Sequence, residues 1–246
     1  MRPIEVACPE FGPISFYGTE LNEGHDFFLY ANCDRSDLDL LVFLDSRGIS
    51  ASFEGSLAQK IIRQCNGKGI LVICRPLELT TWATFVNFLS LNKLSPNKIL
   101  TNMGFVDFTP KKKSVLEDAV QQIEGVIGKN VAEPSFVEKY ASSGGDEIPL
   151  YMMSYGGAYK DNIEQLIKAS MTYVINSPLL VPGIRIRRER PPSFFAALQE
   201  SNNFNKSLNA EKVIDFCRFD ETLTYDAVHY TNLGNDLIFA EIEKYL

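Results

Sequence analysis

The chain has 246 residues, of which 45% are hydrophobic and 22% charged, as in a globular domain with a sizeable core. Its net charge of -7 argues against general nucleic-acid binding, because phosphate-binding surfaces need an excess of Lys and Arg. There is no run of about 18 apolar residues and no apolar segment typical of a signal peptide near residue 1. We therefore expect no membrane association and take the cytoplasm as the default location. The five cysteines lack paired spacing and are interpreted as small core side chains, not as disulfides or metal ligands.

The first 36 residues contain short strand-like pieces, 14–17 and 27–30, that are interrupted by Gly, Pro and Asn. This pattern predicts a small N-terminal β extension, residues 1–36, packed on a main domain that comprises residues 37–246.

Two continuous apolar runs, 40–44 and 70–74, open the main domain. Such runs are typical of strands that are buried on both faces of a parallel sheet. Further strands are expected at 98–102, at 149–154 after a loop around 142–145, and at 213–216. Segments with helical spacing lie between the strands, and they are 57–62, 82–89, 114–127, 161–175 and the closing 232–246.

The alternation of strands and helices predicts an α/β fold, a three-layer α/β/α sandwich around a parallel sheet of about five strands. Right-handed crossovers bring the carboxyl ends of all parallel strands to one edge of the sheet, where binding sites of such folds lie.

Ser46 directly follows the first buried strand and is therefore expected at this edge. A serine hydroxyl needs a base within hydrogen-bonding reach to act as a nucleophile. His229, one of two histidines, lies just before the last helix, and Asp226 precedes it by three residues. That spacing lets the carboxylate reach Nδ1 of the imidazole and fix its tautomer. The other histidine, His25, is interpreted as a loop residue.

These two blocks, Asp45-Ser46 after an aliphatic strand and Asp226-x-x-His229 before a terminal helix, resemble the SGNH (GDSL-like) hydrolase family. The segment 226–235 is especially similar to the last conserved block of that family. The resemblance implies an SGNH-type, flavodoxin-like fold and a catalytic triad in which Ser46 is the nucleophile, His229 the base and Asp226 the orienting carboxylate.

The chain departs from the family pattern where oxyanion donors are expected. Leu44 replaces the Gly that usually precedes Asp-Ser, and the segment 75–81 lacks the Gly of the second block. In the closest match to the third block, 104–107, Val106 occupies the place of the donating Asn, and Asp107 is interpreted as a structural brace. The substitutes that we considered for oxyanion or substrate binding are Asn102, Gly104, Thr80 and Thr81.

A basic run, 185–190, lies in the long connection before the last strand. Runs of charge usually form a solvated face, but this one could also bind an anionic substrate group, with Arg187 as a candidate.

The leading interpretation is a serine-dependent hydrolase of small acyl esters, such as O-acetyl groups on carbohydrate, with no metal or organic cofactor. Three alternatives stay open: a sugar O-acyltransferase on the same fold, an SGNH-like binding protein with impaired catalysis, and an unrelated transferase whose basic run binds a nucleotide. Separately, Ser46 and the segment 226–229 could be ordinary turn and cap residues. The sequence does not indicate an oligomeric state.

Overall fold

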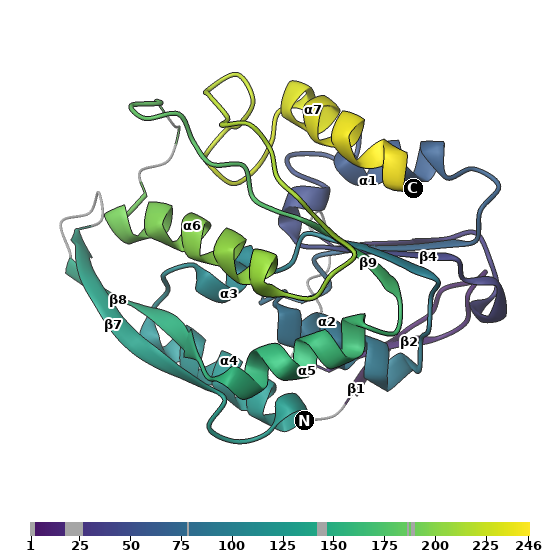
Figure 1. Ribbon diagram of the computed structural model, residues 1–246, viewed down its shortest axis with the longest axis horizontal. Helices are drawn as coiled ribbons and strands as arrows, with labels where there is room; N and C mark the ends of the chain where they lie inside the picture. The colour runs from purple at the N-terminus through teal and green to yellow at the C-terminus, as the bar shows by residue number, and fades with distance from the viewer. Residues whose placement is uncertain (1–2, 18–26, 78, 142–146, 186, 188–189) are drawn as a thin grey trace.

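The computed structural model describes residues 3–17, 27–77, 79–141, 147–185, 187 and 190–246. Its centre is a six-stranded sheet with the strand order β10-β9-β6-β4-β5-β3 (Figure 1). Five of these strands run parallel, and β3 pairs antiparallel with β5 at the edge. The strands are β3 (Phe28–Ala31), β4 (Leu40–Leu44), β5 (Ile70–Cys74), β6 (Lys98–Thr101), β9 (Met171–Ile175) and β10 (Lys212–Ile214). The predicted α/β fold class and mostly parallel sheet are confirmed.

The central strands β4 and β5 are buried along their whole length. Because successive side chains of a strand point to opposite faces, Leu41 and Phe43 join one core cluster while Leu40, Val42 and Leu44 join another. The sheet therefore needs an apolar helix layer on each face.

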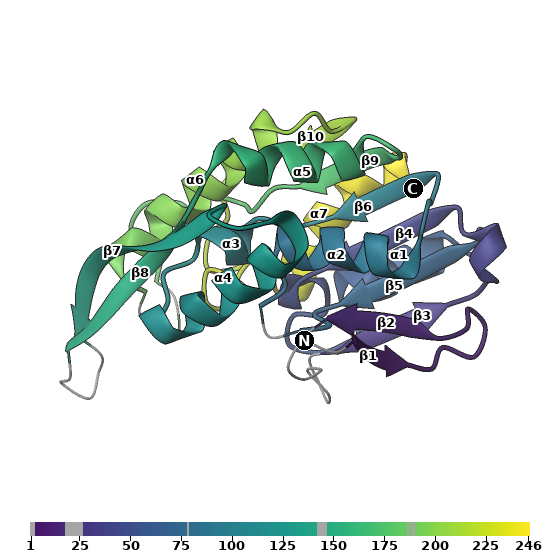
Figure 2. The ribbon, with the colours of Figure 1, turned by 90° about the horizontal axis from the view of Figure 1, so that it is seen from below.

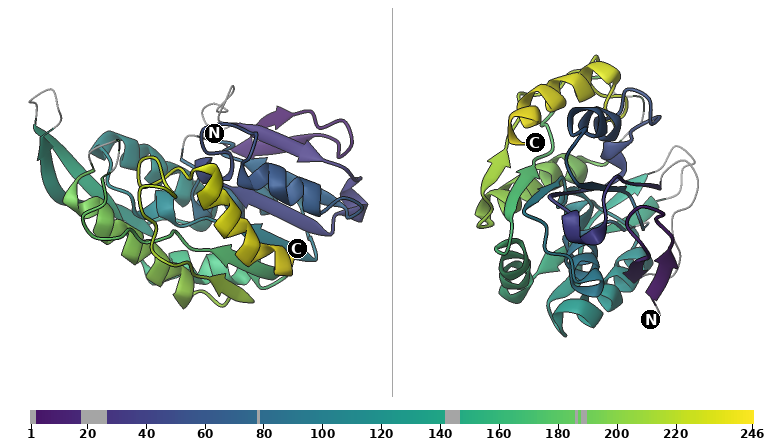
Figure 3. Two further views of the ribbon diagram at one scale, coloured as in Figure 1. Left: turned by 90° about the horizontal axis from the view of Figure 1, so that it is seen from above. Right: turned by 90° about the vertical axis from the view of Figure 1, so that its right-hand side faces the viewer.

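Helices supply both layers, as Figures 1 and 3 show. On one face Trp82 and Phe85 of α2 pack into the same core cluster as Leu41 and Phe43. On the other face Ile61 of α1 and Ile238 of α7 pack against the opposite side chains of the sheet. The helices are α1 (Leu57–Gln64), α2 (Trp82–Asn92), α3 (Phe105–Phe108), α4 (Lys113–Ile127), α5 (Gly157–Ile167), α6 (Pro192–Ser207) and α7 (Asn232–Ile242). Short 3₁₀ turns are η1 (Arg35–Asp37), η2 (Ser46–Gly48) and η3 (Glu243–Tyr245).

The N-terminal strands belong to two different sheets. β1 (Pro3–Val6) and β2 (Ile14–Tyr17) form an antiparallel pair, and the buried Phe16 stacks on Phe88 of α2 with 5.2 Å between ring centroids. β3, which was also expected in the extension, is instead the edge strand of the main sheet. A boundary near residue 36 stays a prediction.

A long hairpin, β7 (Ala132–Ala141) and β8 (Glu147–Tyr155), lies between α4 and α5 in the chain and extends away from the main sheet (Figure 2). The prediction of a central strand at 149–154 is wrong, because this segment pairs with β7. Its residues are mostly exposed or half-buried, as in a hairpin with one solvated face, whereas a central strand would be buried on both faces. The loop predicted around 142–145 lies outside the described residues.

The fourth parallel strand of the main sheet is β9, in a segment for which the sequence predicted a helix, 161–175. Helix α5 ends at Ile167, and the β-branched and aromatic residues Thr172, Tyr173, Val174 and Ile175 continue as a strand between β6 and β10. Helix α6, which the sequence analysis did not identify, begins with proline at its first position.

Candidate active site

Ser46 lies at the carboxyl edge of the sheet, in the 3₁₀ turn that follows β4. Asp45 fixes this turn: its backbone N–H donates to Oδ1 of Asn102 at 2.8 Å, and its own Oδ1 accepts from the backbone N–H of Arg47 at 2.9 Å. The end of β4 is thereby tied to the end of β6, its neighbour in the sheet.

Asp226 and His229 lie on the loop before α7, where the carboxylate folds back on its own backbone. Oδ1 of Asp226 accepts from the N–H groups of Val228, at 3.0 Å, and His229, at 2.9 Å. Ala227 adopts φ 72 in this turn, a left-handed conformation that favours glycine. The turn presents the other oxygen, Oδ2, to Nδ1 of His229 at 3.2 Å.

The structure brings the three predicted triad residues together across 183 positions of sequence. Nε2 of His229 lies 3.2 Å from Oγ of Ser46, and Nδ1 lies 3.2 Å from Oδ2 of Asp226. The His229 side chain is 33% exposed and that of Asp226 17%, so the imidazole is open to solvent while the carboxylate is largely covered. A hydroxyl, an imidazole and a carboxylate thus form one continuous chain at the edge of the sheet, an arrangement in which a proton can pass from Oγ to the imidazole.

The carboxylate of Asp226 is held ionised by its surroundings. Burial opposes its ionisation, but hydrogen bonds from the ring and backbone of His229 and from the backbone of Val228 outweigh this effect and hold its pKa well below the usual range. An ionised carboxylate at Nδ1 stabilises an imidazolium, which is what a general base needs after it takes a proton.

Arg47, next to Ser46 in sequence, is almost completely buried beneath the site, and sequence reasoning missed it. Its guanidinium pairs with Asp45 at 2.7 Å, donates to Oγ of Ser177 and the carbonyl of Asn102, and lies 4.9 Å from the ring centroid of Phe105. Burial opposes its charge, yet the attraction of Asp45 raises the pKa of Arg47 above its ordinary value. The guanidinium therefore connects the ends of β4, β6 and β9.

The residues considered as oxyanion donors have other partners. Both amide atoms of Asn102 bond to Asp45: Oδ1 accepts its N–H, and Nδ2 donates to its Oδ1 at 2.9 Å. Thr80 is buried, and its hydroxyl donates to the carbonyl of Leu77 at 2.7 Å. Thr81 caps helix α2. An oxyanion role for these residues stays a prediction, and the contacts described here are structural.

Gly104 has φ 111 and lies against helix α6. A Cβ at this position would come within 2.7 Å of Oδ1 of Asn205, whose Nδ2 donates to the carbonyl of Met103. The close approach of α6 therefore explains why this position is glycine.

Arg75 follows β5, where the family pattern has a glycine, and it adopts a left-handed φ of 46. Its backbone N–H donates to the carbonyl of Leu44 at 2.7 Å, so this N–H does not point at the site. Arg75 thus has a backbone conformation typical of glycine, but its N–H does not serve as the oxyanion donor expected from the second block of the family pattern.

Arg187, in the predicted basic run, is exposed. Its backbone N–H donates to the carbonyl of Tyr225 at 3.2 Å, and its guanidinium lies 5.4 Å from the Tyr225 ring centroid. A role in substrate binding stays a prediction. His25 lies outside the described residues.

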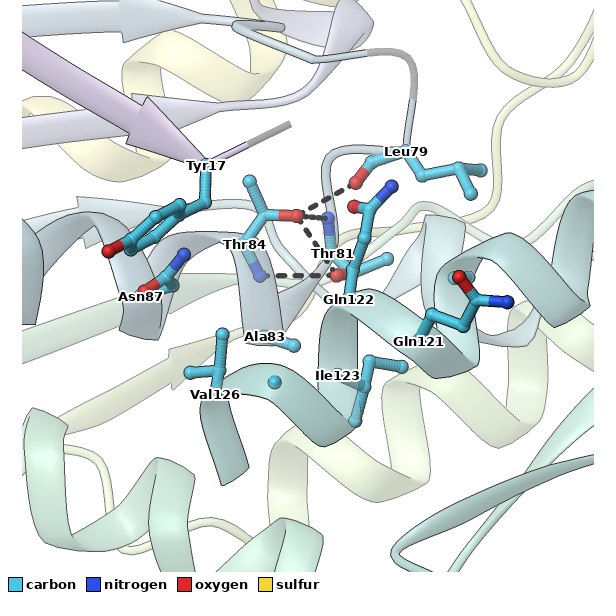
Figure 4. A pocket seen from close by; sticks show the side chains of 12 residues that line it. Tyr17, Leu79, Thr81, Ala83, Thr84, Asn87, Gln121, Gln122, Ile123 and Val126 are labelled. Atoms are coloured by element: carbon cyan, nitrogen blue, oxygen red, sulfur yellow. Dashed lines mark hydrogen bonds between the residues drawn. The ribbon is translucent and has the colours of Figure 1, made fainter. Parts of the chain in front are cut away.

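A pocket of about 380 Å³ between α2 and α4 is separate from this site (Figure 4). Its wall includes Tyr17, Thr81, Thr84 and Gln122, and it contains no member of the triad. Among the described residues, no cluster of three or more His, Cys, Asp or Glu side chains is arranged to hold a metal ion. No helix in the described part of the chain has the length and apolar character needed to cross a bilayer.

Comparisons with known proteins find similarity only in three dimensions. No family model matches the sequence, and no curated protein matches it either. Among solved structures, a protein described as a GDSL-like lipase from Parabacteroides merdae is 12% identical, with 85% of this chain and 94% of that chain aligned and a TM-score of 0.44.

A family two carbohydrate esterase from Clostridium thermocellum is 13% identical over 84% of this chain, with a TM-score of 0.41. An acetyl xylan esterase from Butyrivibrio proteoclasticus is 10% identical over 85% of this chain, with a TM-score of 0.38. This chain spans 63% of each of these two proteins, less than two thirds of their length.

Proposed function

We propose that the protein is a serine hydrolase of small acyl esters. The observation that carries this proposal is the unbroken chain of contacts from Oγ of Ser46 through His229 to Asp226, with both distances at 3.2 Å. A serine that only caps a turn needs no imidazole at its hydroxyl and no largely covered carboxylate behind that imidazole.

In the first half of the reaction, Oγ of Ser46 attacks the ester carbonyl as Nε2 of His229 takes the hydroxyl proton. A bond forms between Oγ and the carbonyl carbon, and the carbonyl electrons move to its oxygen. When this oxyanion collapses, the bond to the alkoxy group breaks and the imidazolium returns the proton to the departing alcohol. Asp226 stabilises the imidazolium throughout.

In the second half, His229 takes a proton from water, whose oxygen attacks the acyl carbon. The bond to Oγ then breaks, the proton returns to Ser46, and a carboxylic acid leaves. Each half needs only the base and its carboxylate for proton transfer.

The substrate that we propose to test first is an O-acetyl ester on a carbohydrate. This choice follows the resemblance of the two sequence blocks to SGNH hydrolases. The exposed imidazole favours an alcohol portion that stays at the surface of the protein.

A second candidate function, an SGNH-like binding protein with impaired catalysis, is favoured by the missing oxyanion donors. The amide of Asn102 is bonded to Asp45, and the backbone N–H of Arg75 is bonded to Leu44. Loss of one preorganised donor typically lowers a rate by roughly 100- to 1000-fold. Under this candidate, the triad persists without useful turnover.

A fluorophosphonate probe separates the two candidates, because it phosphorylates only an activated serine. We expect labelling of one residue, Ser46, together with hydrolysis of p-nitrophenyl acetate. Both should disappear in Ser46→Ala. The matched control is Ser52→Ala, which removes an exposed hydroxyl six residues further along the same loop, bonded to the carbonyl of Glu54.

Failure of the wild-type protein to react with the probe would overturn the hydrolase proposal. Labelling without hydrolysis of any acyl ester, including acetylated oligosaccharides, would instead support the impaired binding protein.

A further inference from the structure

We propose that Arg190 is a positioning residue for the triad, which holds Oδ2 of Asp226 in place and lowers the proton affinity of His229. The consequence for catalysis rests on the proposed function, but the effect of Arg190 on His229 can be measured without turnover.

Arg190 makes three hydrogen bonds to Asp226. Its Nε and one terminal nitrogen donate to the backbone carbonyl at 3.1 and 3.0 Å, and the same terminal nitrogen donates to Oδ2 at 2.8 Å. That oxygen is also the one that faces Nδ1 of His229. The planar fork of Arg190 therefore fixes both the main chain and the side chain of Asp226, which a lysine cannot do in the same way.

The guanidinium is itself held in place. It lies 4.9 Å from the ring centroid of Phe194, in the first turn of α6, and its side chain is only 12% exposed. The hairpin in turn anchors that turn, because Oε1 of Glu138 accepts from the backbone N–H and the hydroxyl of Ser193. Arg190 is thus a fixed charge beside the carboxylate.

A fixed positive charge beside Oδ2 must change the electrostatic interaction between Asp226 and His229. Without Arg190, the backbone N–H groups of Val228 and His229 would still hold Oδ1, but Oδ2 would lose its bond to the guanidinium. Arg190 also adds positive charge, which partly cancels the field with which Asp226 favours the imidazolium. Removal of the guanidinium should therefore strengthen the attraction between Asp226 and a protonated His229.

Among the described residues, other charged and titratable groups also lie around His229, and the substitution of Arg190 removes none of them. Ser46 contacts the ring, and the buried Asp45–Arg47 pair lies near Tyr230. Arg187 lies over the ring of Tyr225, and the backbone N–H of Tyr225 donates to the carbonyl of His229. A change in the titration of His229 in an Arg190 variant can therefore be attributed to the lost guanidinium.

The test is an NMR titration of the imidazole, which is practical because the chain has only two histidines. Replacement of His25 with Gln identifies the His229 signal. In Arg190→Gln, we expect the titration midpoint of His229 to rise by about half a pH unit or more, and the acid limb of kcat/KM for p-nitrophenyl acetate to move up by the same amount.

Two further variants control for structural damage. Arg190→Lys restores the charge but not the paired hydrogen bonds of the guanidinium. The midpoint should therefore return toward that of the wild type, while kcat should stay below the wild-type value. Arg185→Gln makes the same charge change at an exposed position five residues earlier and should leave the midpoint unchanged. Melting curves show whether each variant is folded.

An unchanged or lower His229 midpoint in a folded Arg190→Gln protein would overturn the inference. So would an equal shift in Arg185→Gln. Because the midpoint is measured without substrate and the probe labels Ser46 independently, failure of the hydrolase proposal and failure of the Arg190 inference give different results.

Discussion

Asp226 and Asp107 both lie near the carboxyl edge of the sheet, and their surroundings shift the pKa of the carboxyl group in opposite directions. Asp226 lies in a half-open loop, where hydrogen bonds hold its pKa well below the usual range. Asp107 is completely buried at the other side of the edge, and burial raises its pKa to about 6, although hydrogen bonds from Tyr159 and Trp82 and the charge of Lys111 lower it.

The partners of Asp107 are structural. Both of its oxygens accept from the backbone N–H of Trp82 at 3.2 Å, at the start of α2, and the hydroxyl of Tyr159 on α5 donates to Oδ1. The hydroxyl of Tyr155, at the end of β8, donates to the Asp107 carbonyl at 3.2 Å. This cluster ties two helices and the hairpin together, as the interpretation of Asp107 as a brace predicted.

The comparison shows that burial alone does not identify a catalytic carboxylate. Asp107 is the more deeply buried of the two, but the described side chains and backbone groups around it are the start of a helix, two tyrosines and the charged Lys111. Asp226 contacts an imidazole that contacts a hydroxyl. The variants that follow test this division between a carboxylate for chemistry and a carboxylate for stability.

The largest effect is expected for Asp226→Asn, which keeps the shape of the side chain and removes its charge. An amide at this position favours the wrong tautomer of His229, so kcat for p-nitrophenyl acetate should fall by about 1,000- to 10,000-fold. The melting temperature should change little, because Oδ1 can still accept from the two backbone N–H groups. A loss of less than tenfold would mean that this carboxylate does not serve the base.

A smaller effect, and on stability instead of rate, is expected for Asp107→Ala. The N–H of Trp82 and the hydroxyl of Tyr159 would lose their buried acceptor, which should lower the free energy of unfolding by about 2–4 kcal/mol. Urea denaturation measures this loss, and kcat of the folded fraction should stay within about threefold of the wild type. A stable but inactive Asp107→Ala protein would contradict the division.

The smallest effect is a change in pH dependence for Asp107→Asn, which keeps an acceptor for Trp82 but cannot ionise. Because the pKa of Asp107 is raised to about 6 from 3.8, the folded state binds its proton more tightly than the unfolded state between these values. The contribution of Asp107 to stability is therefore present below about pH 4 and decreases as the pH rises through 6.

In Asp107→Asn this decrease, about 1–3 kcal/mol, should be absent. Unfolding free energies from urea titrations at pH 4, 5, 6 and 7 provide the measurement. Parallel pH profiles for wild type and variant would show that the carboxyl group titrates alike in the folded and unfolded states.

The sequence was sufficient for the elements whose pattern has one physical meaning. The apolar runs of β4 and β5 can only be strands buried on both faces, and the residues that follow them must lie at the carboxyl edge. Ser46 could be placed by this argument alone. The order of Asp226 and His229 before the last helix supplied the rest of the triad.

Other parts needed the structure because their local pattern is ambiguous. The helical spacing of α5 continues to Met171, so the whole of β9 was assigned to a helix, and the half-buried strand β8 was taken for a central one. The burial of Arg47 had no signal in the sequence, because its partners Asn102 and Ser177 lie 55 and 130 residues away. The proline at the start of α6 was a signal that could have revealed this helix and, with it, the place of Arg190.

The contact between Ser46 and His229 spans 183 positions, and this has a consequence during synthesis on the ribosome. The hydroxyl emerges long before its base, and the loop of His229 reaches it only when α7 docks on α1 through Ile238 and Ile61. A nascent or truncated chain that ends before this loop carries an ordinary serine. Under the proposed function, reactivity of Ser46 is therefore expected to appear only with the completed fold.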